Sequence, residues 1–145
     1  MSALLEEVRR EIVGLHGFFL DWFHGSASRE DLDTRFLSRL HPELVFVPPE
    51  GHVLLASALK GAFDTAHGTN PDFKIQIRDV AIRHVIDDHV LATYTEWQVG
   101  ARTSPQTNNA RFSTVLMKRG DPYQWLHIQE TWLPKADQSA ERFDF

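Results

Sequence analysis

Two consecutive stretches, RFSTVLMKR at residues 111–119 and YQWLHIQETWLP at residues 123–134, decide the fold that this sequence predicts. Read at period two, the period of a β-strand, each stretch carries apolar residues on both faces with polar residues among them. Gly120-Asp121-Pro122 between them has the composition of a tight turn. The two stretches therefore predict an antiparallel hairpin. Large apolar side chains fall on both of its faces, so we expect something to cover each face.

Polar side chains interrupt the apolar faces of this hairpin. Arg111 and Ser113 share a face of the first strand with Val115 and Met117. Strict alternation along the second strand places His127 and Gln129 beside Trp125. Glu130 then falls on the reverse face, where we expect it at a dimer interface or at the strand end. Arg, His and Gln among apolar neighbours are typical of a pocket lining.

Helical spacing predicts three helices upstream of the hairpin. Apolar residues recur every three or four positions over residues 3–23, as on the buried stripe of an amphipathic helix. Ser28 is an N-cap for a second helix that closes at His41-Pro42, and a third helix runs through residues 55–66. A short strand at residues 43–47 separates the second helix from the third.

The period changes from helix to strand at Phe73. Apolar residues alternate over 73–82 but slip by one position, which predicts a bulge near Arg78-Asp79. Asp87-Asp88 forms a turn into a partner strand at 90–99, and a flexible loop at 100–109 leads to the hairpin. The sequence therefore predicts an α+β domain whose N-terminal helices pack in a strongly curved antiparallel sheet.

Composition indicates one globular domain at residues 1–134 followed by a polar tail at 135–145. The chain has 145 residues, 42% of them hydrophobic, and its apolar runs are too short to span a bilayer. A net charge of −5 argues against a nucleic-acid partner. The N-terminus has no signal-like apolar region, so we expect a cytoplasmic location. The absence of cysteine removes thiol chemistry.

The order of helices and strands resembles the nuclear transport factor 2-like superfamily, also called the SnoaL-like or cystatin-like α+β fold. The resemblance rests on the passage from Gly51 to Ile77 and on the strands from Tyr94 to Pro134, which end in a His-x-x-Glu-Thr-Trp-Leu-Pro pattern. It implies a cone with a largely apolar internal pocket, and a homodimer through the outer face of the sheet. The superfamily includes isomerases, dehydratases, cyclases and binding modules, so it does not fix a function.

The candidate catalytic residues are Glu96, His127 and Tyr94. Glu96 and Tyr94 fall on one strand face, where a carboxylate beside aromatic residues would have a raised pKa suited to proton transfer. The alternative is that Glu96 forms an ion pair with Arg111 on the next strand, which requires no function. His127 titrates near neutral pH, but it can equally be a buried structural histidine.

The candidate ligand-binding residues combine one cation with hydrogen-bonding and apolar groups. They are Arg111, Gln129, Trp22, His52, Val115 and Met117. Arg111 would hold an anion or a developing negative charge. We expect no metal and no cofactor, because turn chemistry already explains the sequence cluster around Asp87-Asp88.

The sequence thus predicts a small-molecule-binding domain with a largely apolar pocket, for an apolar or aromatic ligand that carries one anionic or carbonyl group. One alternative is a cofactor-independent acid–base enzyme of the isomerase, cyclase or dehydratase type. The other is a purely structural dimerisation module in which the same residues have no chemical role.

Overall fold

Three helices and a six-stranded sheet make up the structure, a computed structural model that describes residues 2–145. The helices are α1 (Ala3–His24), α2 (Arg29–Arg35) and α3 (Ala56–Asp64). The strands are β1 (Leu40–Val47), β2 (Leu54–Leu55), β3 (Lys74–Ile86), β4 (His89–Val99), β5 (Asn109–Lys118) and β6 (Gln124–Trp132). Short 3₁₀ helices are η1 (Leu37–Arg39), η2 (Lys135–Asp137) and η3 (Ala140–Phe143). The predicted α+β class is confirmed.

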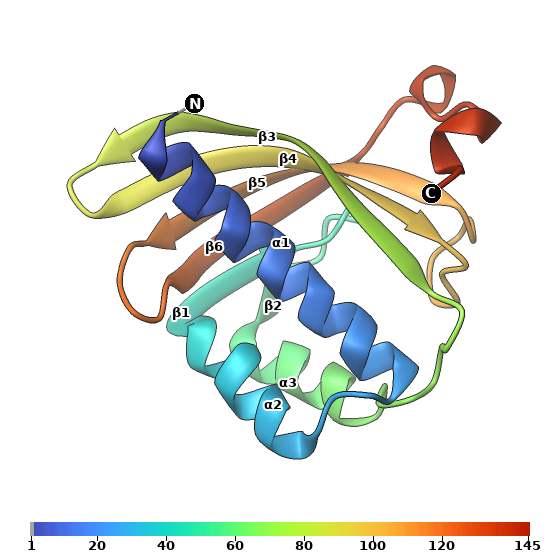
Figure 1. Cartoon of the computed structure of the whole chain (residues 1–145), viewed down its shortest axis with the longest axis horizontal. Coiled ribbons are helices and arrows are strands. Elements are labelled where there is room, and N and C mark those ends of the chain that lie inside the picture. The colour runs from blue at the N-terminus through green and yellow to red at the C-terminus, as the bar shows by residue number, and fades with distance from the viewer. Residues whose placement is uncertain (1) are drawn as a thin grey trace.

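Helix α1 runs across one face of the curved sheet and supplies much of the core (Figure 1). The Ser2 hydroxyl accepts the Leu5 N–H at 3.1 Å and caps its start, and Gly25 ends it at φ 86°, a backbone conformation that costs glycine little. One stripe of α1 is buried as its spacing predicts: Val8, Ile12, Leu15, His16, Phe18 and Trp22. No helix within residues 2–145 is long and apolar enough to cross a membrane.

The sheet is mixed rather than antiparallel, which corrects the expected topology. Its strand order is β2-β1-β6-β5-β4-β3, and β1 runs parallel to β6 at one side of the antiparallel strands β3 to β6. The expected strand at 43–47 therefore begins earlier, at Leu40, and joins the main sheet. Its partner lies more than seventy residues away along the chain, and no local pattern specifies such a pairing.

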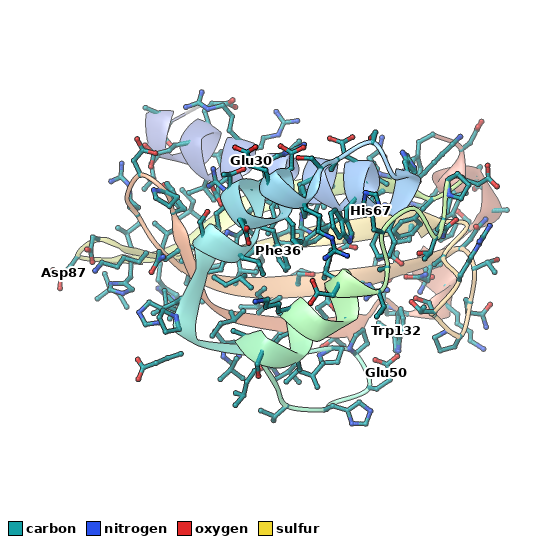
Figure 2. The ribbon with its side chains drawn as sticks, turned by 90° about the horizontal axis from the view of Figure 1, so that it is seen from below. Glu30, Phe36, Glu50, His67, Asp87 and Trp132 are labelled. Carbon is teal, nitrogen blue, oxygen red and sulfur yellow. The ribbon has the colours of Figure 1, made fainter. Side chains whose placement is uncertain are left out.

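The predicted slip in β3 is present. Pairing of β3 with β4 shifts register between Arg78 and Ala81, and Asp79 adopts φ 59° there. A second shift follows between Ile82 and His84. Extra residues of this kind bend a strand and increase its twist, which curves the sheet around the helices. The β3–β4 hairpin turns at Asp87, whose side chain lies at its free tip in Figure 2.

A register shift in β6 reverses the expected faces of that strand. Met117 pairs with Trp125, but the neighbouring Leu116 pairs with His127, so Leu126 is an extra residue. Trp125 and Glu130 consequently face the helices, whereas His127 and Gln129 face away from them. The strict alternation assumed from the sequence was wrong at this point.

The C-terminal tail folds back onto the outer face of the sheet (Figure 1). The Phe143 ring lies 5.2 Å from that of Trp97 on β4, and the guanidinium groups of Arg78 and Arg142 lie 4.3 and 4.4 Å from the same indole. Trp97 is fully buried as a result. The tail is polar in composition, as expected, yet it contributes aromatic cover to the sheet.

Candidate functional site

A cavity of about 220 Å³ lies between the helices and the inner face of the sheet. Its wall is largely apolar and includes six phenylalanines from α1, α2–η1, β1, α3 and the loop before β3: Phe19, Phe23, Phe36, Phe46, Phe63 and Phe73. Phe36 lies between the helical layer and the sheet in Figure 2. Short loop segments at 69–70 and 101–104 line the rest of the wall.

The sheet contributes buried charged residues to the cavity from two adjacent rows across strands β4, β5 and β6, and the exposed Arg102 lines it from the loop after β4. One row pairs Tyr94 with Ser113 and Ser113 with Glu130. The next row pairs Glu96 with Arg111. Because alternate residues of a strand share a face, both rows point inward toward α1. The cavity thus has apolar walls and a polar end, the usual composition of a small-molecule site.

His16 of α1 completes the polar end. Its Nε2 lies 3.0 Å from Oε1 of Glu96, and its Nδ1 lies 2.8 Å from the Ile12 carbonyl oxygen. Both ring nitrogens face acceptors, so the ring donates from both when it is protonated. Burial opposes this charge, but attraction to Glu96 outweighs it and raises the pKa of His16. His16 and Glu96 therefore form a buried ion pair.

Arg111 is held by a different set of acceptors. Its Nη1 donates to Glu130 Oε1 at 3.2 Å, and its Nη2 donates to Asn109 Oδ1 at 2.9 Å and to Gln98 Oε1 at 3.2 Å. The guanidinium also lies 4.8 Å from the Trp132 ring, within range of a cation–π interaction. Its Nε, although buried, has no hydrogen-bond partner within residues 2–145.

The two buried carboxylates differ in acidity. For Glu96, burial would raise the pKa, but His16, Arg111 and the Gln98 amide outweigh it and lower the pKa to about 2. For Glu130, burial and then repulsion from Glu96 outweigh the attraction of Arg111 and raise the pKa to about 7. One carboxylate is therefore fixed as an anion, while the other exchanges its proton near neutral pH.

The predicted Glu96–Arg111 ion pair does not form. The two residues are direct neighbours in the β4–β5 register, but no salt bridge joins them within residues 2–145. Each has a partner that the sequence did not indicate. Glu96 pairs with His16 from α1, and Arg111 pairs with Glu130, which the extra residue in β6 turns inward.

The other predicted site residues fall in several places. Tyr94 lines the cavity, and burial followed by repulsion from Glu96 raises the pKa of its hydroxyl. His127 and Gln129 bond to each other at 3.1 Å on the outer face, outside the cavity. His52 is exposed in the loop before β2. None of the residues His127, Gln129 and His52 lines the cavity, contrary to the expectation from the sequence.

Three more predicted ligand-binding residues are core residues. Val115 and Met117 are fully buried in the hydrophobic cluster and are not part of the cavity wall. Trp22 is also fully buried, and its indole N–H donates to the Phe63 carbonyl at 2.8 Å. Sequence reasoning missed His16 and placed Glu130 on the wrong face. The only signal for His16 was its position on the buried stripe of α1, four residues after Ile12.

Neither a family model nor a curated protein matches the chain. Among solved structures, an NTF-2 like protein of unknown function from Pseudomonas aeruginosa is 30% identical, with a TM-score of 0.76. The match covers 88% of this chain and 98% of that one.

Two more distant structures share the fold. An NTF2-like protein of unknown function from Pseudomonas putida is 16% identical, with 97% of this chain and 94% of that one covered and a TM-score of 0.66. The CaMKII hub of S. rosetta is also 16% identical, with 86% of this chain and 95% of that one covered and a TM-score of 0.61. The Pseudomonas aeruginosa protein shares 30% sequence identity over most of both chains, and it has the same architecture. The chain therefore belongs to the NTF2-like family.

Proposed function

We propose that this protein binds a small, largely apolar molecule in its internal cavity, with one polar group of the ligand at the Arg111–Glu130 end. The observation that carries the proposal is the cavity itself: aromatic walls that end in a buried cluster of charged side chains. A closed core would fill this space with apolar side chains, because voids and buried charges both cost stability.

Unused hydrogen-bonding capacity around the cavity supports the proposal. Three buried polar atoms have no partner within residues 2–145: Asn70 Oδ1, Arg111 Nε and Ser113 Oγ. Asn70 and Arg111 line the cavity, and Ser113 lies between Tyr94 and Glu130 in the strand register. An unsatisfied buried polar group costs about 1–3 kcal/mol, so a ligand that supplies partners would recover part of that cost.

A thermal-shift screen tests this function. The panel contains aromatic and aliphatic acids, their amides, and matched alcohols and ketones. A ligand at 100 times its Kd adds about 2.7 kcal/mol of stability, which raises the melting temperature measurably. Phe63→Trp, which places a larger ring in the cavity wall, should abolish the shifts. Shifts that persist in this variant would locate binding elsewhere.

Acid–base catalysis is a second candidate function, and the carboxyl group of Glu130 favours it. A group with a pKa of about 7 that lines an apolar cavity can both accept and donate a proton at neutral pH. Glu96 is a weak base by comparison, since its pKa is about 2. Tyr94 and Arg111 would stabilise the negative charge that develops on a substrate carbonyl.

Deuterium exchange tests the catalytic role without knowledge of the substrate. Enolisable ketones incubated with the protein in heavy water should incorporate deuterium, and Glu130→Gln should abolish the incorporation. Glu96→Gln serves as the comparison, because it removes the other carboxylate. Exchange no faster than in buffer across the panel would leave binding as the function.

We also propose a homodimer through the outer face of the sheet. Phe112 on β5 points away from the cavity and is 38% exposed, with the half-buried Leu116 on the same face. Exposed apolar residues that share a sheet face are typical of an interface. The tail covers the Trp97 region of this face, so the contact would involve the β5–β6 region.

A further inference from the structure

The buried charged residues at the polar end of the cavity balance one another when all four are ionised. Arg111 and protonated His16 contribute two positive charges, and Glu96 and Glu130 contribute two negative charges. All four residues line the cavity, and the fifth charged lining residue, Arg102, is exposed and donates to the Thr69 carbonyl outside this buried cluster. An ionic ligand that entered this cluster would leave it with a net charge in a buried site, which is costly unless a proton moves to compensate.

We propose that the ligand is a monocarboxylate with an apolar body, and that it binds together with one proton. Its carboxylate replaces the Glu130 carboxylate on Arg111, and Glu130 takes up a proton from solvent as it gives up that contact. The process is the association of a protein, an anion and a proton, with no covalent bond made or broken. This inference rests on the proposed cavity function and specifies its ligand.

The contact between Arg111 and Glu130 can be exchanged. It consists of one hydrogen bond from Nη1 at 3.2 Å, whereas a guanidinium can hold a carboxylate with two parallel bonds. The buried Nε of Arg111 also lacks an acceptor within residues 2–145. Arg111 therefore has donor capacity that Glu130 does not use. A ligand carboxylate supplies two acceptor oxygens in the same place.

Glu130 is the member of the cluster that can release its charge. The groups that face it are Arg111 on β5, Glu96 and Tyr94 on β4, and His16 on α1. Glu96 is held by His16 at 3.0 Å and by the Gln98 amide at 2.6 Å, so it keeps its negative charge. Burial and repulsion from Glu96 already raise the pKa of Glu130 to about 7. A second anion nearby raises that pKa further.

The charge balance also separates ligand classes. An ammonium ligand would add a third positive charge to a cluster that already balances two, so it is repelled. A neutral amide leaves the protonation of Glu130 unchanged. A carboxylate restores neutrality once Glu130 is protonated, and the new Glu130 hydroxyl can donate a hydrogen bond to it. Proton uptake on binding is therefore the signature of the carboxylate.

Isothermal titration calorimetry measures that uptake directly. Phenylacetate and octanoate are titrated at about pH 8 in buffers that differ in ionisation enthalpy, beside phenylacetamide and octanamide. The slope of the observed enthalpy against the buffer enthalpy should give about one proton taken up per acid and none per amide. The affinity for the acids should fall about fivefold between pH 7 and 8 and about tenfold between pH 8 and 9.

The Glu130→Gln variant identifies the group that takes the proton. It should bind the acids without proton uptake, with an affinity that does not change over this pH range. Glu43→Gln on β1 alters an exposed carboxylate and should behave as the unaltered protein. Uptake that persists in Glu130→Gln would assign the proton to His16 and overturn the proposal.

The remaining outcomes separate this inference from the proposed function. Acids that bind the unaltered protein without proton uptake, or amides that bind while acids do not, would overturn the inference and leave the binding function in place. If neither class binds, the inference is overturned, and the alcohols and ketones of the thermal-shift panel then decide whether the binding function stands. The buffer dependence is measured on the unaltered protein, so the test does not depend on the folding of any variant.

Discussion

Glu96 and Arg111 lie directly opposite each other on β4 and β5, and each is bound to a different residue. The carboxylate of Glu96 binds His16, and the guanidinium of Arg111 binds Glu130 at 3.2 Å. His16 helps to lower the pKa of Glu96 to about 2, whereas burial and repulsion from Glu96 raise the pKa of Glu130 to about 7 although Arg111 is its partner. The two carboxylates of the cavity therefore respond differently to pH.

Glu130 should make the stability of the protein fall as the pH rises. Its pKa is raised from 4.5 to about 7 in the folded chain, so between these pH values the folded state holds more protons than the unfolded state. The free energy of unfolding then decreases by about 3 kcal/mol across this window. Urea unfolding at a series of pH values should show the fall, and Glu130→Gln should remove it. His16, whose pKa is also raised, adds a further loss above its ordinary value of 6.5 in both proteins. An identical pH profile in the two proteins would contradict the assignment.

His16→Leu should destabilise the fold strongly. It leaves the buried Glu96 without its main partner, and an unpaired buried charge of this kind costs about 3 kcal/mol. Adding Glu96→Gln should recover part of the loss, because the amide carries no charge. The same substitution at the exposed His52 is the control and should change little. Additive effects of the two cavity substitutions would mean that the pair is not coupled.

The sequence could predict the features that neighbouring residues determine. It could not predict the features that depend on residues far apart along the chain. Local patterns predicted the α1 stripe, the bulge near Asp79 and the turn at Asp87, and the structure has all three. In each case the signal lies within one turn of helix or a few residues of strand. The order of elements was enough to indicate the family, since it is a property of the whole chain.

The site was harder to predict because single residues decide it. Leu126 adds one residue to β6, and a shift of one position exchanges the two faces of a strand. That shift placed Glu130 inside and His127 outside, against the expectation. His16 has the helical spacing of a core residue, so its link to Glu96, eighty positions away, left no trace in the local pattern.

The C-terminal tail should stabilise the sheet through Phe143. This ring is half-buried and packs 5.2 Å from Trp97, so Phe143→Ala should lower the free energy of unfolding by about 1–2 kcal/mol. It should also expose Trp97 to water and shift its fluorescence to longer wavelength. Asp144→Ala, at an exposed neighbouring position, is the control. A tail without a structural role would give the two variants equal stability.

Phe112→Asp should dissociate the proposed dimer. A charge in the centre of an apolar contact must be desolvated without a partner, which disfavours association. Sedimentation at micromolar concentration should show a dimer for the unaltered protein and a monomer for the variant, with ligand binding in the cavity retained. Lys118→Glu changes an exposed charge on the same strand and should leave the dimer intact. A monomeric unaltered protein would rule out this interface.

Methyl NMR can show directly whether a ligand binds in the cavity between the helices and the sheet. Four aliphatic residues with labelled methyl groups line the cavity on three sides: Leu15 of α1, Leu59 of α3, Ile75 of β3 and Ile128 of β6. Titration with phenylacetate should shift these resonances to a common saturation point, while those of Leu116 on the outer face stay in place. Shifts confined to Leu116 and its neighbours, or none at saturating ligand, would contradict the account.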